Sequence, residues 1–117
     1  LARFFADDYV DHAHREIRQG GAGDRENMLA AFAAVGAAFP DTHHIIHDLI
    51  AEGDRVVARV SAAGVHAGSL DGEEPSGRRI HNDAIVVYRL ENGRIAERWS
   101  RERESILEQI GAVRCPR

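Results

Sequence analysis

Residues 51–100 decide the fold, and they read AEGDRVVARVSAAGVHAGSLDGEEPSGRRIHNDAIVVYRLENGRIAERWS. Three runs within this stretch are rich in Val and Ile, as strands usually are: residues 55–67, 79–90 and 94–100. Residues that favour turns separate these runs, and Asn92-Gly93 between the last two is a strong short-range hairpin signal. The stretch therefore predicts an antiparallel meander of long strands on which the rest of the chain packs.

The segment at the start of the chain has apolar residues at helical spacing. Leu1, Phe4 and Phe5 are followed by Tyr9 one turn later. We therefore expect residues 1–18 to be helical, with a break near residues 7–8.

A second helix is expected to begin at Asp24, which suits the N-cap position, and to continue to about Phe39. Its apolar stripe consists of Met28, Leu29, Phe32, Val35 and Phe39. Pro40 should end this helix, because the residue before a proline resists the helical conformation.

The remaining segments complete an α+β order. Residues 42–51 predict a strand that precedes the meander, and residues 102–110 predict a short C-terminal helix capped by Gly111. The order is helices, then four strands, then a terminal helix. We expect one domain over residues 1–117, since nothing in the chain reads as a linker or an internal repeat.

Composition and charge exclude several classes of function. Hydrophobic residues make up 44% of the chain, which is enough for a core. The formal charge is −4, with no basic block and only 6% aromatic residues, which argues against nucleic-acid binding. No apolar run approaches the roughly 20 residues of a membrane span. Cys115 is the only cysteine, so no internal disulfide forms and a cytoplasmic protein is the expectation.

Both faces of the predicted strands carry apolar residues. Along residues 55–67, Val56, Ala58 and Val60 lie on one face while Val57 and Val65 lie on the other. A sheet with one face in water should alternate more clearly. We therefore expect the helices to cover one face and a second copy of the chain to cover the other, giving a homodimer.

Several stretches of the chain resemble the SnoaL-like polyketide cyclase family, within the nuclear transport factor 2-like superfamily. The matching stretches are DYVDH at residues 8–12, AEGDRVVAR at 51–59, GVHAG at 64–68, GEEPSGR at 72–78, NGRIAERW at 92–99 and EQIG at 108–111. Each motif is weak by itself, and their order and spacing together are more specific.

The resemblance implies a fold and a chemistry. The fold is a cone, in which a strongly curved antiparallel sheet and helices enclose a pocket. The chemistry is aldol ring closure without a cofactor, with an acidic residue as acid and base. The ligand would be a small or polyketide-like carbonyl compound that is largely apolar.

The acidic residue of the family follows the tryptophan of the last strand, and this chain is one residue short there. Counting back from Gly111 places Glu102 at that position, whereas counting forward from Trp99 places Arg103 there. A carboxylate in an apolar pocket has a raised pKa and can act near neutral pH. Glu102 is therefore the expected acid/base, and Glu104 is a second carboxylate for the pocket.

The resemblance also suggests which other residues belong to the site. His66 and His12 match motif positions and would donate a hydrogen bond to a substrate carbonyl or move a proton. Tyr9 and Trp99 would line the cavity, and Asn82 is a further polar residue inside a strand. Arg59 is expected to pair with Asp83 across neighbouring strands.

Metal and cofactor chemistry are not expected. The seven histidines show no recognised ligand spacing, and His43 and His47 would lie about 13 Å apart on a strand, at ~3.3 Å per residue. The chain has no GxSxG turn and no phosphate-binding loop.

Three functions remain open. The first is a cofactor-free cyclase or isomerase, the second a protein that binds a small apolar ligand without turnover, and the third an epoxide-hydrolase-like enzyme. The orientation of the acids distinguishes them. A buried Glu102 or Glu104 favours the first and no buried acid favours the second. An inward Asp–Arg pair favours the third, for which Arg59 and Asp83 would have to point inward.

Overall fold

The computed structural model describes residues 2–12, 23–70, 72–102 and 109–110. These residues form a short 3-10 turn, five strands and one long helix: η1 (Ala2–Phe4), β1 (Phe5–Asp11), α1 (Asp24–Ala38), β2 (His43–Glu52), β3 (Arg55–Val65), β4 (Arg79–Glu91) and β5 (Arg94–Glu102). The fold is α+β, as the sequence predicts.

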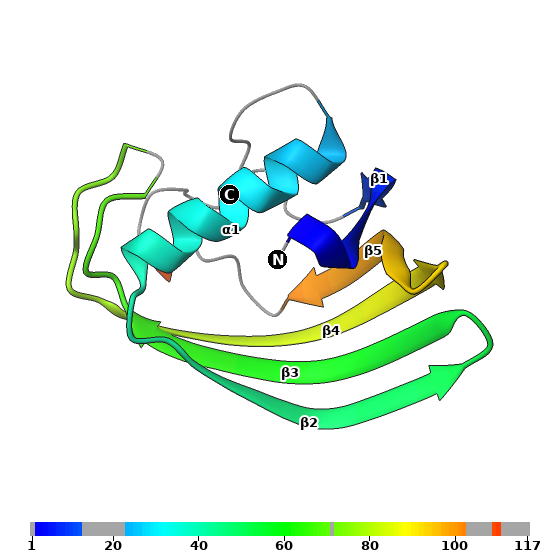
Figure 1. The fold of residues 1–117 in the computed structure, drawn as a ribbon. Helices are drawn as coiled ribbons and strands as arrows, with labels where there is room; N and C mark the ends of the chain where they lie inside the picture. Colours follow the sequence, from blue (N-terminus) through cyan, green and yellow to red (C-terminus); the bar gives the residue numbers. More distant parts are fainter. Residues whose placement is uncertain (1, 13–22, 71, 103–108, 111–117) are drawn as a thin grey trace, which may run out of the picture.

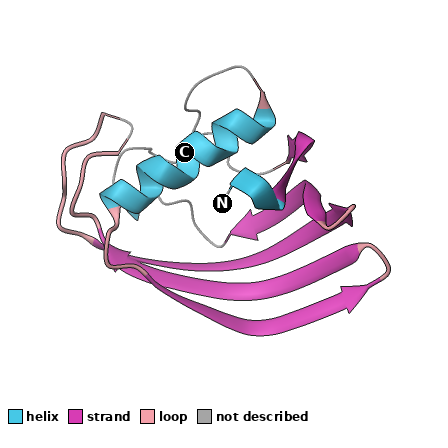
Figure 2. Cartoon of the chain, in the orientation of Figure 1, coloured by secondary structure: helices cyan, strands magenta, loops and turns pink. Residues whose placement is uncertain are grey.

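The five strands form one open, curved sheet with the order β1-β5-β4-β3-β2. Strands β2 to β5 pair antiparallel in sequence order, which confirms the predicted meander. The sheet bends around α1, which crosses its concave side (Figure 1). Figure 2 shows the same two layers, with the helix on one side of the strands and nothing described on the other. The side that α1 covers is called the inner face below, and the opposite side the outer face.

The hairpin between β4 and β5 forms where the sequence predicts it. Asn92 and Gly93 both have positive φ, at 52° and 75°. Two successive residues with positive φ are what a two-residue hairpin turn needs, and Asn-Gly supplies them at low steric cost.

The first segment of the chain is not the helix that the sequence predicts. Only Ala2–Phe4 is helical there, and Phe5–Asp11 forms β1, which pairs parallel with β5. The sheet is therefore mixed rather than wholly antiparallel. The helical spacing of Phe5 and Tyr9 also fits a strand, because both side chains are buried on one side while Val10 is exposed. Pairing with the open edge of β5 makes this segment a strand rather than a helix. Residues 13–18 of the predicted helical segment lie outside the described part.

The helix confirms its predicted position but not its predicted cap. α1 ends at Ala38, before Phe39 and Pro40. Gly23 occupies the N-cap position, and the Asp24 carboxylate instead accepts the backbone N–H of Asp11 at 2.9 Å. Asp24 therefore ties the start of α1 to the end of β1.

The predicted C-terminal helix does not begin at residue 102. Strand β5 continues through Glu102, beyond the predicted end at residue 100. Gln109 is helical, and residues 103–108 lie outside the described part of the chain.

Two apolar clusters join the helix to the sheet. One contains Phe5, Tyr9 and Met28 beneath the first turns of α1. The other lies at the far end of the helix and contains Ala31, Ala38, Phe39, Leu70, Ile80 and Ile110. The helix is buried through Met28, Ala31 and Ala38, so the predicted stripe is only partly right: Phe32, at its centre, is 39% exposed.

The described residues of the connection between β3 and β4, 66–70 and 72–78, form an arm beside the end of α1 (Figure 1). The backbone N–H groups of Ala67 and Gly68 both donate to the carbonyl oxygen of Ala38, at 2.9 and 3.0 Å. A Cβ atom on Gly68 would lie 2.5 Å from the carbonyl oxygen of Ala37. The arm approaches the helix so closely that only glycine fits.

We predict that Gly68→Ala lowers the free energy of unfolding by about 1–3 kcal/mol, because the added methyl group forces arm and helix apart. Gly36→Ala is the matched control: a Cβ there meets nothing within 4 Å. Alanine is favoured over glycine inside a helix by about 1 kcal/mol, so this control should gain stability. Urea unfolding measures both. A Gly68 variant as stable as the parent would contradict the close contact.

Candidate functional site

A row of polar side chains runs along the inner face. Alternation along β5 turns Ala96, Arg98 and Ser100 inward, and all three are buried. Asp11 of β1 is in register with Arg98, and Glu102 continues the same side of β5. Since Glu102 is in register with Ala84, Asn82 of β4 comes next along the face. We define the polar row as Asp11, Arg98, Ser100, Glu102 and Asn82.

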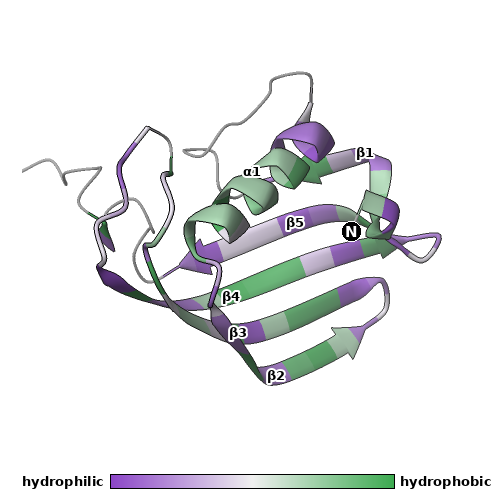
Figure 3. Ribbon diagram, turned by 60° about the vertical axis from the view of Figure 1, so that its left-hand side comes forward, coloured by the Kyte–Doolittle hydropathy of each residue, from purple (hydrophilic) through white to green (hydrophobic). Residues whose placement is uncertain are grey.

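An apolar wall lies beside this row. Ser100 is in register with Val86 of β4, which is in register with Ala58 of β3, and both of these are buried. Figure 3 shows hydrophobic residues along the middle of β2, β3 and β4. The inner face thus has a polar side at β5 and an apolar side toward β2.

The polar row begins with a buried ion pair. An Arg98 nitrogen lies 3.5 Å from the Asp11 carboxylate, and the two residues are only 6% and 8% exposed. The Tyr9 hydroxyl donates to the same carboxylate at 2.8 Å. Burial, and then this hydrogen bond, raise the pKa of the Tyr9 hydroxyl, which therefore stays protonated. The Arg98 guanidinium lies 5.8 Å from the Phe32 ring of α1, which confirms that this side faces the helix.

His66 lies at the other end of α1 and is completely buried. Its ring lies 5.4 Å from that of Phe39. The Ser76 backbone N–H donates to His66 Nδ1 at 3.1 Å, so Nδ1 is an acceptor and a neutral ring carries its proton on Nε2. Within the part of the chain that the structure describes, His66 Nε2 has no hydrogen-bond partner. A buried N–H group in that state costs about 1–3 kcal/mol.

The site residues predicted from the sequence divide between the helix side of the sheet and the outer face. On the helix side, Tyr9, Asn82 and Glu102 lie with the polar row, and His66 lies at the end of α1. His12 and Trp99 lie together on the outer face, where their rings stack at 4.9 Å. Glu104 lies outside the described residues.

His12 and Trp99 belong to a charged cluster on the outer face. His12 Nε2 donates to Glu97 at 2.7 Å, and Arg89 donates to the other oxygen of that carboxylate at 2.8 Å. The hydrogen bond from Arg89, and to a smaller extent that from His12, lowers the pKa of the Glu97 carboxyl. Arg55 lies 5.0 Å from the Trp99 ring. The cluster ties β1, β5, β4 and β3 together away from the helix.

The predicted pair of Arg59 and Asp83 is replaced by other contacts. Arg59 donates to Asp48 of β2 at 2.6 Å. Asp83 accepts hydrogen bonds from Ser61 at 2.7 Å and from His81 at 3.0 Å. The register explains the change, because Arg59 is opposite both Asp48 and Ile85, while Asp83 is opposite Ser61. Both residues lie on the outer face.

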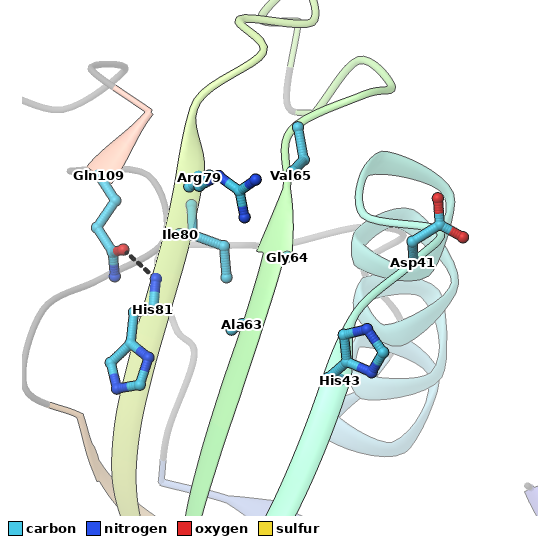
Figure 4. A pocket seen from close by; sticks show the side chains of 9 residues that line it. All are labelled: Asp41, His43, Ala63, Gly64, Val65, Arg79, Ile80, His81 and Gln109. Carbon is cyan, nitrogen blue, oxygen red and sulfur yellow. Dashed lines mark hydrogen bonds between the residues drawn. The ribbon is translucent and has the colours of Figure 1, made fainter.

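Two open clefts of the described residues lie on the outer face and share His81. One of about 630 Å³ is bordered by His43, Arg79, His81 and Gln109, whose amide oxygen accepts the His81 backbone N–H at 2.8 Å (Figure 4). The other, of about 660 Å³, is bordered by His47, Ser61 and Asp83, with Glu102 at its edge. No three His, Cys, Asp or Glu side chains of the described part are grouped closely enough for a metal ion.

Sequence reasoning missed Asp11, Arg98 and Ser100 as site residues. Ala96, Arg98 and Ser100 do alternate with Glu97 and Trp99, which is the available signal. The alternation alone does not say which side is inward, because the side with Trp99 is the more hydrophobic of the two. The position of α1 decides this.

The sequence model of the family described as SnoaL-like polyketide cyclase matches residues 1–109. The chain therefore belongs to this family. No curated protein matches it. No helix in the described residues has the length and apolar character needed to cross a lipid bilayer.

Solved structures of similar proteins agree with this assignment. TsrD from Streptomyces laurentii has 27% identity and a TM-score of 0.75, with 97% of this chain and 81% of that one covered. IdmH from Streptomyces antibioticus, a candidate polyketide cyclase, has 29% identity and a TM-score of 0.72, with 93% and 83% covered. AclR from Streptomyces galilaeus, a candidate hydroxylase, shares the fold at 22% identity and a TM-score of 0.73, with 97% and 73% covered.

We predict that Arg98→Met costs about 3–5 kcal/mol of stability, because it leaves the buried Asp11 carboxylate without its cation. The double variant Asp11→Asn/Arg98→Met should recover much of this loss. Arg59→Met is the matched control: its pair with Asp48 is about half exposed, so the change should be below ~1 kcal/mol. Chemical denaturation measures all variants. Equal losses for Arg98→Met and Arg59→Met would contradict the buried pair.

Proposed function

We propose that this chain is a cofactor-free acid/base enzyme that closes rings in a small or polyketide-like carbonyl compound. The observation that carries the proposal is the polar row beside an apolar wall on the inner face. A flat apolar molecule with oxygen atoms along one edge matches such a surface, because its rings meet Val86 and Ala58 while its oxygens meet the polar row. Membership of the SnoaL-like family supports the same class of ligand.

The chemistry needs a base and a hydrogen-bond donor. A base removes a proton from the carbon beside one carbonyl, the resulting enolate attacks a second carbonyl in the same molecule, and the new alkoxide takes up a proton. Glu102, half-buried at the end of the polar row, is the proposed base that later returns the proton. The Nε2–H of His66, which has no partner among the described residues, is the proposed donor to a carbonyl oxygen at the far end of the ligand, away from the reacting carbon. His12 and Trp99 have no part in this proposal, because they lie on the outer face.

The separation of the two groups limits the ligand. Glu102 is in register with Ala84 and, through it, with Val60 of β3. His66 follows Val60 by six residues, which corresponds to about 20 Å along an extended strand at ~3.3 Å per residue. Allowing for side-chain reach and for the bend of the sheet, the two groups would contact different parts of one extended molecule. This supports a polyketide-like chain over a very small ketone.

A second function is supported by one observation. Asp11 and Arg98 are a buried Asp–Arg pair, the arrangement that favours an epoxide-hydrolase-like enzyme, although the residues differ from those expected. Asp11 would accept a proton from the water that attacks the epoxide and return it to the alkoxide formed when the C–O bond breaks. Hydrolysis of styrene oxide by the parent that is lost in Asp11→Asn, with no effect of Glu102→Gln, would favour this function.

Binding without turnover is the remaining alternative. It gains support if the parent binds aromatic ketones but converts neither a linear poly-β-carbonyl compound nor an epoxide.

We also propose that the outer face pairs with a second copy of the chain. Ile45, Ile50 and Ile85 on this face are 56%, 61% and 52% exposed. Every residue of the edge strand β2 is exposed. Monomers rarely leave large apolar patches in water, and a stable dimer here would bury more than about 1,000 Å² in total.

We predict that Glu102→Gln lowers kcat by about 100-fold or more on a linear poly-β-carbonyl substrate, because the amide cannot take up the proton. Ring closure is followed by the absorbance of the cyclised product. Glu52→Gln, at the exposed end of β2, is the matched control and should leave kcat unchanged. Full activity of the Glu102 variant would remove this residue from the mechanism.

We predict that the parent sediments as a dimer at micromolar concentration and that Ile85→Lys shifts it to monomer, because a charge would enter the exposed apolar patch of Ile45, Ile50 and Ile85. Leu49→Lys is the matched control: this residue is 64% exposed but lies on the inner side of β2, opposite Ala58. Analytical ultracentrifugation distinguishes the species. A monomeric parent would refute the proposal.

A further inference from the structure

Ser100 is a buried serine whose hydroxyl has no partner among the residues that the structure describes. It is 8% exposed, and its Oγ atom makes no hydrogen bond to any of them. A hydroxyl removed from water without a partner costs about 1–3 kcal/mol relative to an apolar group of the same shape. Alanine would therefore be the more stable residue here, and the hydroxyl needs an explanation outside the ligand-free fold.

The surroundings of Ser100 indicate where that partner would come from. Its neighbours in register across the sheet are Val86 and Ala58, whose side chains offer no donor or acceptor. Along β5 it stands between Arg98 and Glu102, within the polar row. The hydroxyl thus lies at the border between the apolar wall and the polar row, which is where the first oxygen atom of a flat ligand would come.

We propose that Ser100 is a specificity-determining residue that donates a hydrogen bond to a carbonyl oxygen of a fused-ring ketone bound on the inner face. This inference rests on the proposed function, because it places the ligand between α1 and the sheet. The new element is the Ser100 hydroxyl, which would let the protein distinguish a ketone from a hydrocarbon of the same shape. Glu102 carries a charge and is the proposed base, whereas Ser100 would donate to a neutral oxygen.

The expected discrimination is modest and measurable. A neutral hydrogen bond contributes about 1–1.5 kcal/mol net, which corresponds to about a tenfold change in affinity. Removing the hydroxyl should therefore change the relative affinity for a ketone and a hydrocarbon by about tenfold. It should do so without loss of stability, because no bond within the protein is broken.

The test compares two probes on the full chain by titration calorimetry. Alpha-tetralone is a fused-ring ketone, and tetralin has the same ring system without the oxygen. The ratio of their affinities is measured in the parent, in Ser100→Ala and in Ser61→Ala. Ser61 is the matched control, since its hydroxyl lies on the outer face and bonds to Asp83 and His47 at 2.7 Å each.

We expect the ratio to fall about tenfold in Ser100→Ala and to stay at the parent value in Ser61→Ala. Thermal unfolding of the free proteins should show Ser100→Ala at least as stable as the parent. An unchanged ratio while both probes still bind would overturn the role of Ser100 and leave the proposed ligand site intact. A melting temperature for Ser100→Ala below that of Ser61→Ala would also overturn it, by showing a structural bond. No binding of either probe to the parent would overturn the ligand site, and the Ser100 role with it.

Discussion

The contacts of Asp11 are the constraint on which the site depends. Its backbone N–H is held by the Asp24 carboxylate at the start of α1, and its own carboxylate accepts from the Tyr9 hydroxyl and pairs with Arg98. One residue therefore connects β1, β5 and α1. Because the Asp11 carboxylate pairs with Arg98 and accepts from the Tyr9 hydroxyl, its buried charge is compensated where the helix meets the sheet.

The two faces of the sheet differ in which side chains they carry and in how these side chains are bonded. Inward residues of β5 are polar and buried, and they lie beside small and branched apolar side chains of β4 and β3. Outward residues of the same strand take part in the cluster of His12, Glu97, Arg89 and Trp99. A ligand site on the first face and a contact with a second copy on the other would not compete. The mixed polarity of the strands follows from this division.

Two kinds of buried polar group lie on or near the inner face. Tyr9, Asp11 and Arg98 contact one another. His66 Nε2 and Ser100 Oγ have no hydrogen-bond partner among the described residues, and a buried polar atom in that state costs about 1–3 kcal/mol. In the proposed function, the first group would position the site and the second would be available to a ligand. Sites of this type commonly exchange some stability for function.

The sequence by itself determined the meander, the end of α1 before Pro40 and the family, because these depend on local signals: strand-forming residues, an Asn-Gly turn, a proline and ordered motifs. It also indicated Tyr9, Asn82, His66 and Glu102 as candidate site residues, which stays a prediction. Only the tertiary structure decided that Phe5–Asp11 is a strand, since the open edge of β5 favours pairing over the helix that the spacing of Phe5 and Tyr9 permits. Only the structure separated His12 and Trp99 from the inner residues and brought Arg98 to Asp11. Alternation along a strand divides side chains into two sets, and the helix that packs on the sheet decides which set is inside.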